Sequence, residues 1–98
     1  MKKQRRLLLA QQAKDDLVDI WLYIAADSPL HADTFIDYLY TKCLSLCDKP
    51  EIGRKRDELI PGIRSLPIKK YLVFYRITND TIEIARVLSG YRDLETLF

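Results

Sequence analysis

The spacing of the apolar residues changes at Pro50, and this change constrains the fold more than any other feature of the sequence. Before it, apolar residues recur every three or four positions through residues 12–26 and 29–47, which is the period of an amphipathic helix. Ser28 and Pro29 lie between the two segments, and these residue types favour the cap and the first turn of a helix. We therefore expect two helices that form an antiparallel hairpin.

Each expected helix has one apolar face. In the first helix this face comprises Ala13, Leu17, Ile20, Trp21 and Ile24, and the polar side comprises Lys14, Asp15, Asp16 and Asp19. In the second helix the apolar face comprises Ala32, Phe35, Ile36, Leu39, Cys43, Leu46 and Cys47. Carboxylates on a polar helix face are normally solvated, so we expect no acid–base chemistry from the Asp15–Asp16 pair.

After Pro50 the residue types are those of strands and turns. Residues 50–61 are typical of a loop, with a glycine, a basic cluster and a closing Pro-Gly pair. Residues 63–68 are expected to form an edge or irregular strand, because Pro67 has no N–H to donate.

Residues 71–77 and 81–88 are rich in β-branched and aromatic residues, and the Asn-Asp pair between them favours a tight turn. We therefore expect a β-hairpin whose first strand lies centrally, because both of its alternating faces are apolar. Arg86 interrupts the second strand, whose alternation shifts phase between Ile84 and Val87, which indicates a bulge between these two residues.

A short apolar segment over residues 5–10 adds an opening strand. The expected fold is α+β with the order β-α-α-β-β-β, in which the antiparallel helical hairpin packs on one face of a mainly antiparallel sheet. Ninety-eight residues suit a single domain over 1–98. No apolar run approaches the roughly 20 residues that cross a bilayer, so we expect a cytoplasmic protein with no membrane contact.

Charge is distributed unevenly, although the net charge is only +2. Residues 1–10 carry four basic groups and no acids, residues 11–48 carry seven acids against two bases, and residues 49–98 carry ten bases against seven acids. An acidic helical part beside a basic remainder favours an acidic or polyanionic partner. A solvated charged face is the alternative explanation.

Few residues suggest catalysis. The sequence has no glycine-rich phosphate loop and no nucleophile elbow, and His31, the single histidine, falls in the expected first turn of the second helix, where exposure is usual. Cys43 and Cys47 lie on one helix face, so we expect two reduced core thiols rather than a metal site. We therefore expect no catalytic residue, no metal and no cofactor.

Arginine is the residue type that stands out in the second half. Arg64, Arg76 and Arg86 fall in expected strands, and Arg92 follows the last one. Guanidinium groups gathered on a sheet can bind carboxylates or phosphates through paired hydrogen bonds. For each arginine taken singly, a role in solubilising an outward strand face is an equal alternative.

An ordered set of short motifs covers the chain from about Leu8 to Leu94. It comprises Ala13, Asp16-Leu17 and Ile20, then Pro50, Gly53-Arg54, Glu58-Leu59 and Pro61-Gly62-Ile63-Arg64, then Tyr71 to Arg76, and finally Ile82, Ile84, Arg86-Val87-Leu88 and Arg92-Asp93. In this set the chain resembles the ParE/RelE-type toxins of bacterial type II toxin–antitoxin systems. The resemblance implies an antitoxin encoded alongside the toxin that holds it inactive.

The resemblance is nearer to the ParE branch, the plasmid-stabilisation toxins. RelE-like members cleave messenger RNA on the ribosome with basic residues and, in several, a tyrosine close to the C-terminus. Arg64 and Arg92 match such basic positions, but the last aromatic residue is Phe98, which has no hydroxyl, and Tyr91 does not match. ParE-like members share the Arg-Val-Leu and Arg-Asp segments, although many have a histidine where this chain has Ser89.

The ParE resemblance implies a toxin that inhibits DNA gyrase by binding it, without catalysis. We assign the target contact to the residues Arg64, Arg86, Tyr91, Arg92 and Phe98. The alternatives are a ribosome-dependent ribonuclease of the RelE kind, and a toxin fold retained only as an autoregulatory partner of its antitoxin.

The expected partner is a ParD-like antitoxin, with DNA bound only indirectly through the antitoxin complex. We expect the antitoxin to contact the last strands and the groove between sheet and helices, and this region should expose Arg64, Tyr75 and Arg86 in some combination. The incoming peptide either adds a strand or lays a helix in the groove.

Overall fold

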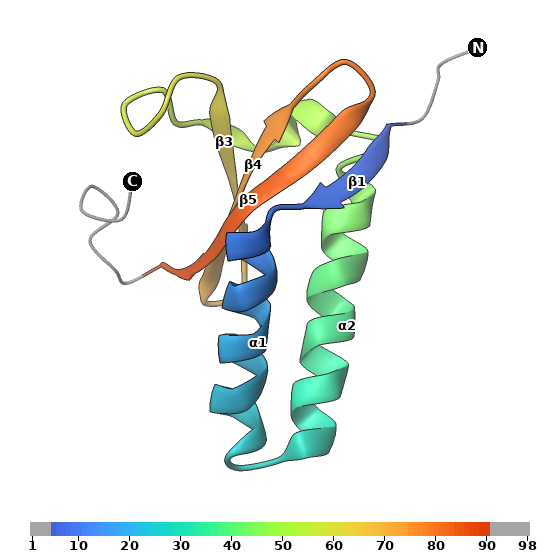
Figure 1. Cartoon of the computed structure of the whole chain (residues 1–98), viewed down its shortest axis with the longest axis vertical. Coiled ribbons are helices and arrows are strands. Elements are labelled where there is room, and N and C mark those ends of the chain that lie inside the picture. Colours follow the sequence, from blue (N-terminus) through green and yellow to red (C-terminus); the bar gives the residue numbers. More distant parts are fainter. Residues whose placement is uncertain (1–4, 91–98) are drawn as a thin grey trace.

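In a computed structural model that describes residues 5–90, a helical hairpin packs on one side of a sheet (Figure 1). The elements are β1 (Arg6–Leu9), α1 (Gln11–Ala25), α2 (Pro29–Ser45), the 3-10 turn η1 (Pro50–Ile52), β2 (Arg54–Lys55), β3 (Ile63–Ile68), β4 (Tyr71–Ile77) and β5 (Thr81–Ser89). The predicted order of helices and strands is confirmed. The prediction of an unbroken loop over residues 50–61 is wrong, because η1 and the short strand β2 lie within it.

The five strands form one sheet in the order β1-β5-β4-β3-β2. Only the β1–β5 pair is parallel, so the sheet is mainly antiparallel as predicted. β1 pairs with β5 from Thr81 to Ile84 and then ends, whereas β5 continues to Ser89. The last five residues of β5 therefore extend beyond its neighbour on that side, where α1 begins.

Two side-chain hydrogen bonds lie at the end of the helical hairpin where α1 turns into α2. Ser28 caps α2 as predicted, since its Oγ accepts the His31 N–H at 3.2 Å, and Pro29 occupies the first turn. Trp21 Nε1 donates to Asp33 Oδ1 at 2.7 Å and so links the two helices. Trp21 was expected in the apolar face but is only half-buried and lies outside the core.

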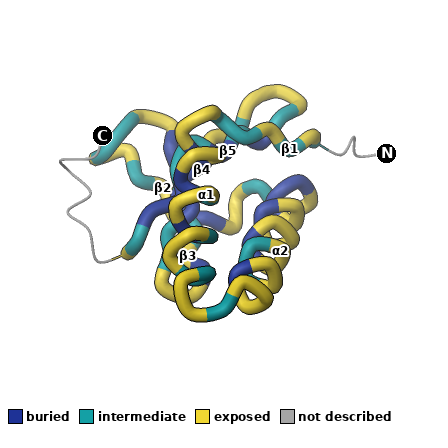
Figure 2. Tube along the Cα trace, turned by 60° about the horizontal axis from the view of Figure 1, so that its bottom comes forward, coloured by how far each residue is buried: buried dark blue, intermediate teal, exposed yellow. Residues whose placement is uncertain are grey.

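β4 lies centrally and is covered on both faces, as its sequence predicted (Figure 2). One face contributes Val73 and Tyr75 to the core shared with the helices, and the other face contributes Phe74 to a smaller cluster beneath the 53–62 segment. Six of the seven apolar positions predicted for the second helix belong to the helix-side core or pack against it, and the seventh, Ala32, is buried outside that cluster.

Two local irregularities of the sheet were also anticipated. Ala85 has no partner on β4, since the register passes from Tyr75–Ile84 to Phe74–Arg86, so the predicted bulge is confirmed. β3 is not an edge strand, but β2 reaches only Arg64 and Ser65. Pro67 therefore lies where β3 has no second neighbour, and its missing N–H interrupts no pairing with β2.

Within residues 5–90, neither helix is long and apolar enough to cross a membrane.

Candidate functional site

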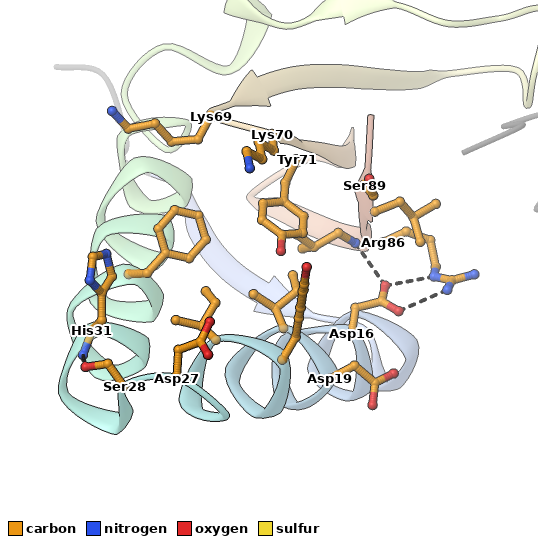
Figure 3. A pocket seen from close by; sticks show the side chains of 16 residues that line it. Asp16, Asp19, Asp27, Ser28, His31, Lys69, Lys70, Tyr71, Arg86 and Ser89 are labelled. Atoms are coloured by element: carbon orange, nitrogen blue, oxygen red, sulfur yellow. Dashed lines mark hydrogen bonds and ion pairs between the residues drawn. The ribbon is translucent and has the colours of Figure 1, made fainter. Parts of the chain in front are cut away.

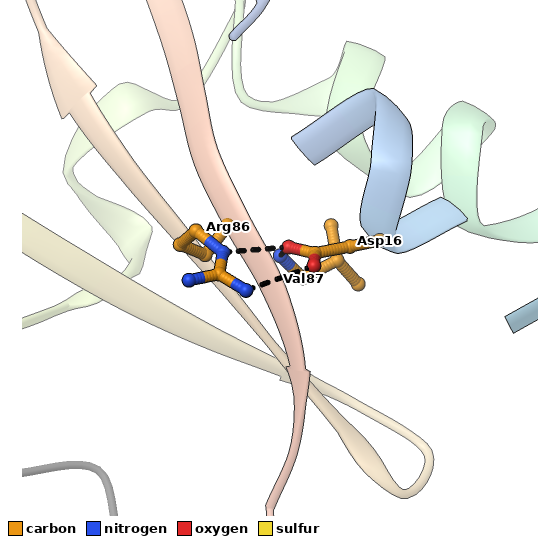
Figure 4. Close-up of polar contacts among 3 residues, drawn as sticks. All are labelled: Asp16, Arg86 and Val87. Carbon is orange, nitrogen blue, oxygen red and sulfur yellow. Dashed lines mark hydrogen bonds and ion pairs between the residues drawn. The ribbon is translucent and has the colours of Figure 1, made fainter. Parts of the chain in front are cut away.

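Asp16 and Arg86 form a two-point ion pair where α1 meets the unpaired end of β5 (Figure 4). Arg86 Nε donates to Asp16 Oδ2 at 2.9 Å, and a terminal guanidinium nitrogen donates to Oδ1 at 3.0 Å. The same carboxylate accepts the backbone N–H of Val87 at 2.9 Å. Asp16 thus supplies the hydrogen-bond acceptor that β1 would have supplied if it continued along β5.

The expectation that Asp16 is a solvated carboxylate is wrong, because only 9% of the residue is exposed. In an α-helix, residues three and four positions apart share a face, so Asp16 lies in line with Ala13 and Ile20, which are both buried. The hydrogen bonds that Arg86 donates to Asp16 are the main cause that raises the pKa of Arg86, while burial acts in the opposite direction. Arg86 is therefore engaged within the fold, with 19% of its side chain exposed.

Arg64 and Tyr75 together hold the segment that follows α2. The Tyr75 hydroxyl donates to the Pro50 carbonyl at 2.7 Å and accepts the Gly53 N–H at 2.8 Å. One terminal nitrogen of Arg64 donates to the Gly53 carbonyl at 2.8 Å and to the Glu51 carbonyl at 3.2 Å. Four polar backbone groups of this segment are thereby satisfied by two strand side chains.

Tyr75 was expected among the residues that are exposed in some combination to an incoming peptide, but it is buried, with an exposed fraction of 0%. Burial raises the pKa of its hydroxyl, and the Gly53 hydrogen bond and the Arg64 charge partly offset that rise. Gly53 is required for this arrangement, since a Cβ atom at that position would overlap the Tyr75 hydroxyl and ring. Gly53, Arg64 and Tyr75, which belong to the motifs of the resemblance, therefore contribute to the fold.

A groove of about 1050 Å³ lies between the closed end of the helical hairpin, the β3–β4 turn and the end of β5 (Figure 3). Its apolar surface comes from Ile20, Ile24, Phe35, Tyr71, Val87 and Leu88. Its charged residues include Asp19 and Asp27 on the α1 side and Lys69 and Lys70 in the β3–β4 turn. Burial is the main cause that raises the pKa of Tyr71, whose ring lies 5.6 Å from that of Phe35.

The groove includes some of the residues that the sequence singled out and omits others. Arg86 and Ser89 line it, and so does His31, which is exposed as predicted. Arg64 and Tyr75 do not line it. Tyr91, Arg92 and Phe98 lie outside the described residues, so their assignment stays a prediction.

Sequence reasoning missed Asp19, Tyr23 and the Lys69–Lys70 turn as site residues. The helical period does place Asp19 and Tyr23 on one face, with Asp16, Ile20 and Asp27, but nothing local indicates that this face borders a groove. The two lysines are 42 or more positions away from Asp19 and Asp27 in the sequence. Only the packing of the sheet on the helical hairpin brings them to the other side of the same groove.

The two cysteines are buried and free, as expected for core thiols. Burial raises the pKa of Cys43 to about 11, and burial followed by the Asp48 charge raises that of Cys47. Both thiols are therefore protonated near neutral pH, which makes them poor nucleophiles. Among residues 5–90, no three His, Cys, Asp or Glu side chains are arranged to hold a metal ion.

Comparison with solved structures supports the fold. The chain is similar to a structure of the chromosomal ParDE toxin–antitoxin system from P. aeruginosa, with a TM-score of 0.75. The match covers 88% of this chain and 96% of that one at 21% sequence identity.

Sequence comparison gives the family. A 45-residue segment is 38% identical to Toxin ParE3 of Caulobacter vibrioides, and the match covers 46% of this chain and 45% of that protein, which is about half its length. The family model for the ParE toxin of the type II toxin–antitoxin system parDE matches residues 7–94, which include both arginine sites and the whole groove. The chain therefore belongs to the ParE toxin family.

Proposed function

We propose that this protein inhibits DNA gyrase by binding it, that it has no catalytic activity of its own, and that a ParD-like antitoxin neutralises it by occupying the groove. The observation that carries this proposal is the match to the ParE toxin family over residues 7–94. Because gyrase acts on DNA in the bacterial cytoplasm, the proposal places the protein there too.

The use of the arginines supports binding rather than RNA cleavage. Cleavage needs cationic groups that face the scissile phosphate and a group that transfers a proton. The Arg64 guanidinium is engaged by backbone carbonyls, and the Arg86 guanidinium is engaged by Asp16. The Tyr75 hydroxyl is buried and uses both of its hydrogen-bonding roles within the fold. These three groups therefore stabilise the fold, and none of them is free to act on a phosphate.

The contact with gyrase is proposed to come mainly from the C-terminal residues Tyr91, Arg92 and Phe98. Arg64 and Arg86 were assigned to the same target contact. Because both guanidinium groups bind partners within the fold, they are proposed to contribute to gyrase binding by holding the shape of the protein. The antitoxin is proposed to contact Arg86 at the wall of the groove rather than Arg64 or Tyr75. DNA is then bound only through the antitoxin complex.

A supercoiling assay with purified gyrase and relaxed plasmid tests the proposal. We expect the purified chain to prevent supercoiling, and we expect Arg92→Glu to weaken that inhibition while the far-ultraviolet circular dichroism spectrum stays unchanged. Arg54→Glu is the matched control, because it makes the same charge change at an exposed position outside the groove. Full inhibition by Arg92→Glu would show that the assignment of the C-terminal residues is wrong.

The same protein is added to translating ribosomes in parallel. If supercoiling is unaffected and messenger RNA is cleaved, the gyrase proposal is wrong and the ribosome-dependent ribonuclease is favoured. No effect in either assay, with a stable antitoxin complex, would favour the alternative of a fold kept for autoregulation.

A further inference from the structure

β1 is an edge strand, and its outer side pairs with no other strand of the described chain (Figure 1). The N–H groups of Arg6 and Ala10 donate at 2.8 and 3.0 Å to carbonyls in or just before β5. Because successive residues of a strand point their backbone groups to opposite sides, Leu7 and Leu9 turn their N–H and C=O groups away from β5. β1 therefore presents backbone donors and acceptors that suit a further strand.

A pocket of about 520 Å³ lies beside this open edge and shares no residue with the groove. β1 contributes Leu7 to its lining, and the second half of α2 contributes Tyr40 and Leu44, whose exposed fractions are 44% and 42%. Arg5 also lines the pocket, and its buried Nε has no hydrogen-bond partner among the described residues. A strand added to β1 would therefore lie over large apolar side chains that the single chain leaves partly uncovered.

The leucines of β1 match a second copy of the same strand. Hydrogen-bonded pairs join residues that both point outward, so an antiparallel copy centred on Leu8 sets each Leu7 opposite Leu9 of the other copy. Leu8 then faces its own counterpart in a pair without backbone hydrogen bonds, where side chains approach most closely. Leu7 and Leu9 pack toward the helices, so Leu8 points to the other face of the sheet, where it is 53% exposed.

The same register keeps like charges apart. It sets Arg6 opposite Ala10 of the other copy, and it brings Arg5 nearest to Gln11, the first residue of α1. The two arginines thereby approach the helical part of the other copy, where residues 11–48 carry seven acids against two bases. A pairing centred on Leu7 also joins outward residues, but it sets both arginines opposite leucines.

We propose that two copies of this chain associate through β1, antiparallel about a twofold axis at Leu8, so that their sheets become one continuous sheet. Each copy supplies the same surface, and both helical hairpins lie on the same side of the sheet. Leu9 of each copy lies beside Leu7 of the other and covers part of the pocket at Tyr40 and Leu44. β1 has only four residues, so the dimer is expected to dissociate on dilution. The inference does not depend on gyrase as the target.

Sedimentation velocity of the full chain over a range of concentrations tests the inference. We expect the mass to rise from that of one chain toward that of two. Leu8→Lys and Leu8→Glu should each keep the chain monomeric, because like charges then face each other across the axis. Leu30→Lys is the matched control, since Leu30 is 78% exposed at the start of α2, and it should still dimerise.

Mixing the two Leu8 variants separates a lost interface from a damaged fold. An equal mixture of Leu8→Lys and Leu8→Glu should recover the dimer with one copy of each, because the substituted residues form a pair of opposite charge. Leu8→Cys should form a disulfide-linked dimer under mild oxidation, since residues opposite each other in such a pair have Cα atoms about 4.5 Å apart. Leu30→Cys should remain mostly monomeric. Cys43 and Cys47 are buried in all of these variants.

A chain that stays monomeric at every concentration would overturn the inference, and so would a dimer that Leu8→Lys leaves intact. Loss of the dimer in both Leu8 variants without recovery on mixing would show that Leu8 does not face its counterpart, which also overturns it. If the chain alone is monomeric and Leu8→Lys weakens its complex with a co-expressed antitoxin, the antitoxin occupies this edge instead of a second copy.

Discussion

Arg64 and Arg86 hold the fold at two places that differ in what surrounds them. Arg64 donates to neutral carbonyls in a segment closed over the buried Tyr75, and neither residue lines the groove. Arg86 pairs with a carboxylate beside the open groove. The comparison teaches that an arginine in a family motif can serve the fold, while other charged residues that line the groove, such as Lys69 and Asp19, lie outside the motifs.

Removal of Asp16 should produce the largest effect. In Asp16→Ala, Arg86 loses its partner and the Val87 N–H loses its acceptor, so we expect the free energy of unfolding to fall by about 3 kcal/mol. Urea denaturation measures it. Asp15→Ala is the matched control, because Asp15 is the exposed neighbour, and it should change stability by no more than about 0.5 kcal/mol.

The double variant Asp16→Ala/Arg86→Met sharpens this test. It removes both charged partners, so it should recover part of the stability that Asp16→Ala alone loses. A double variant less stable than Asp16→Ala would mean that Arg86 contributes through contacts other than this pair.

Removal of the Tyr75 hydroxyl should have the next largest effect. Tyr75→Phe leaves the Pro50 carbonyl and the Gly53 N–H without their partner, and we expect a loss of about 2 kcal/mol in the free energy of unfolding. Tyr40→Phe, at an exposed tyrosine of α2, is the control and should be nearly neutral. Equal stability of the two variants would contradict a structural role for the hydroxyl.

Tyr23→Ala should separate binding from stability. Because Tyr23 is exposed on the groove side of α1, we expect the free energy of unfolding to change by no more than about 0.5 kcal/mol, while the affinity for the antitoxin falls about tenfold. Anisotropy and thermal unfolding of the same samples measure both. Val18→Ala on the solvent side of α1 is the control, and a similar loss of affinity there would place the binding surface elsewhere.

The smallest expected effect on stability concerns Glu58, in the segment over residues 53–62. The hydrogen bond from Arg56 is the main cause that lowers the pKa of Glu58, so the ionised carboxylate is the form that folding favours. Its contribution to stability is present above the ordinary pKa of 4.5 and is lost as the pH falls through the lower value in the folded protein. We expect a slight destabilisation of Glu58→Gln at pH 7 that disappears in acid. A difference that persists at pH 2 would exclude this cause.

Local patterns were sufficient to predict most of the elements. The helical period, the Ser28 cap and the alternation in residues 71–88 depend on neighbours a few positions apart, and each of these predictions is confirmed. The phase shift before Val87 even located the bulge. The exception is β2, two residues long, whose pairing with β3 leaves no periodic signal in the sequence.

The sequence by itself determined the hairpin, the central strands and the arginines around which a site was sought. Only the tertiary structure decided their roles, because Asp16 and Arg86 are 70 positions apart and meet where β1 happens to end along β5. The same packing buries Tyr75 and brings Lys69 across from Asp27. Helical and strand periods depend on backbone geometry within a few residues, whereas the burial and pairing of a charge depend on which surfaces the assembled fold brings together.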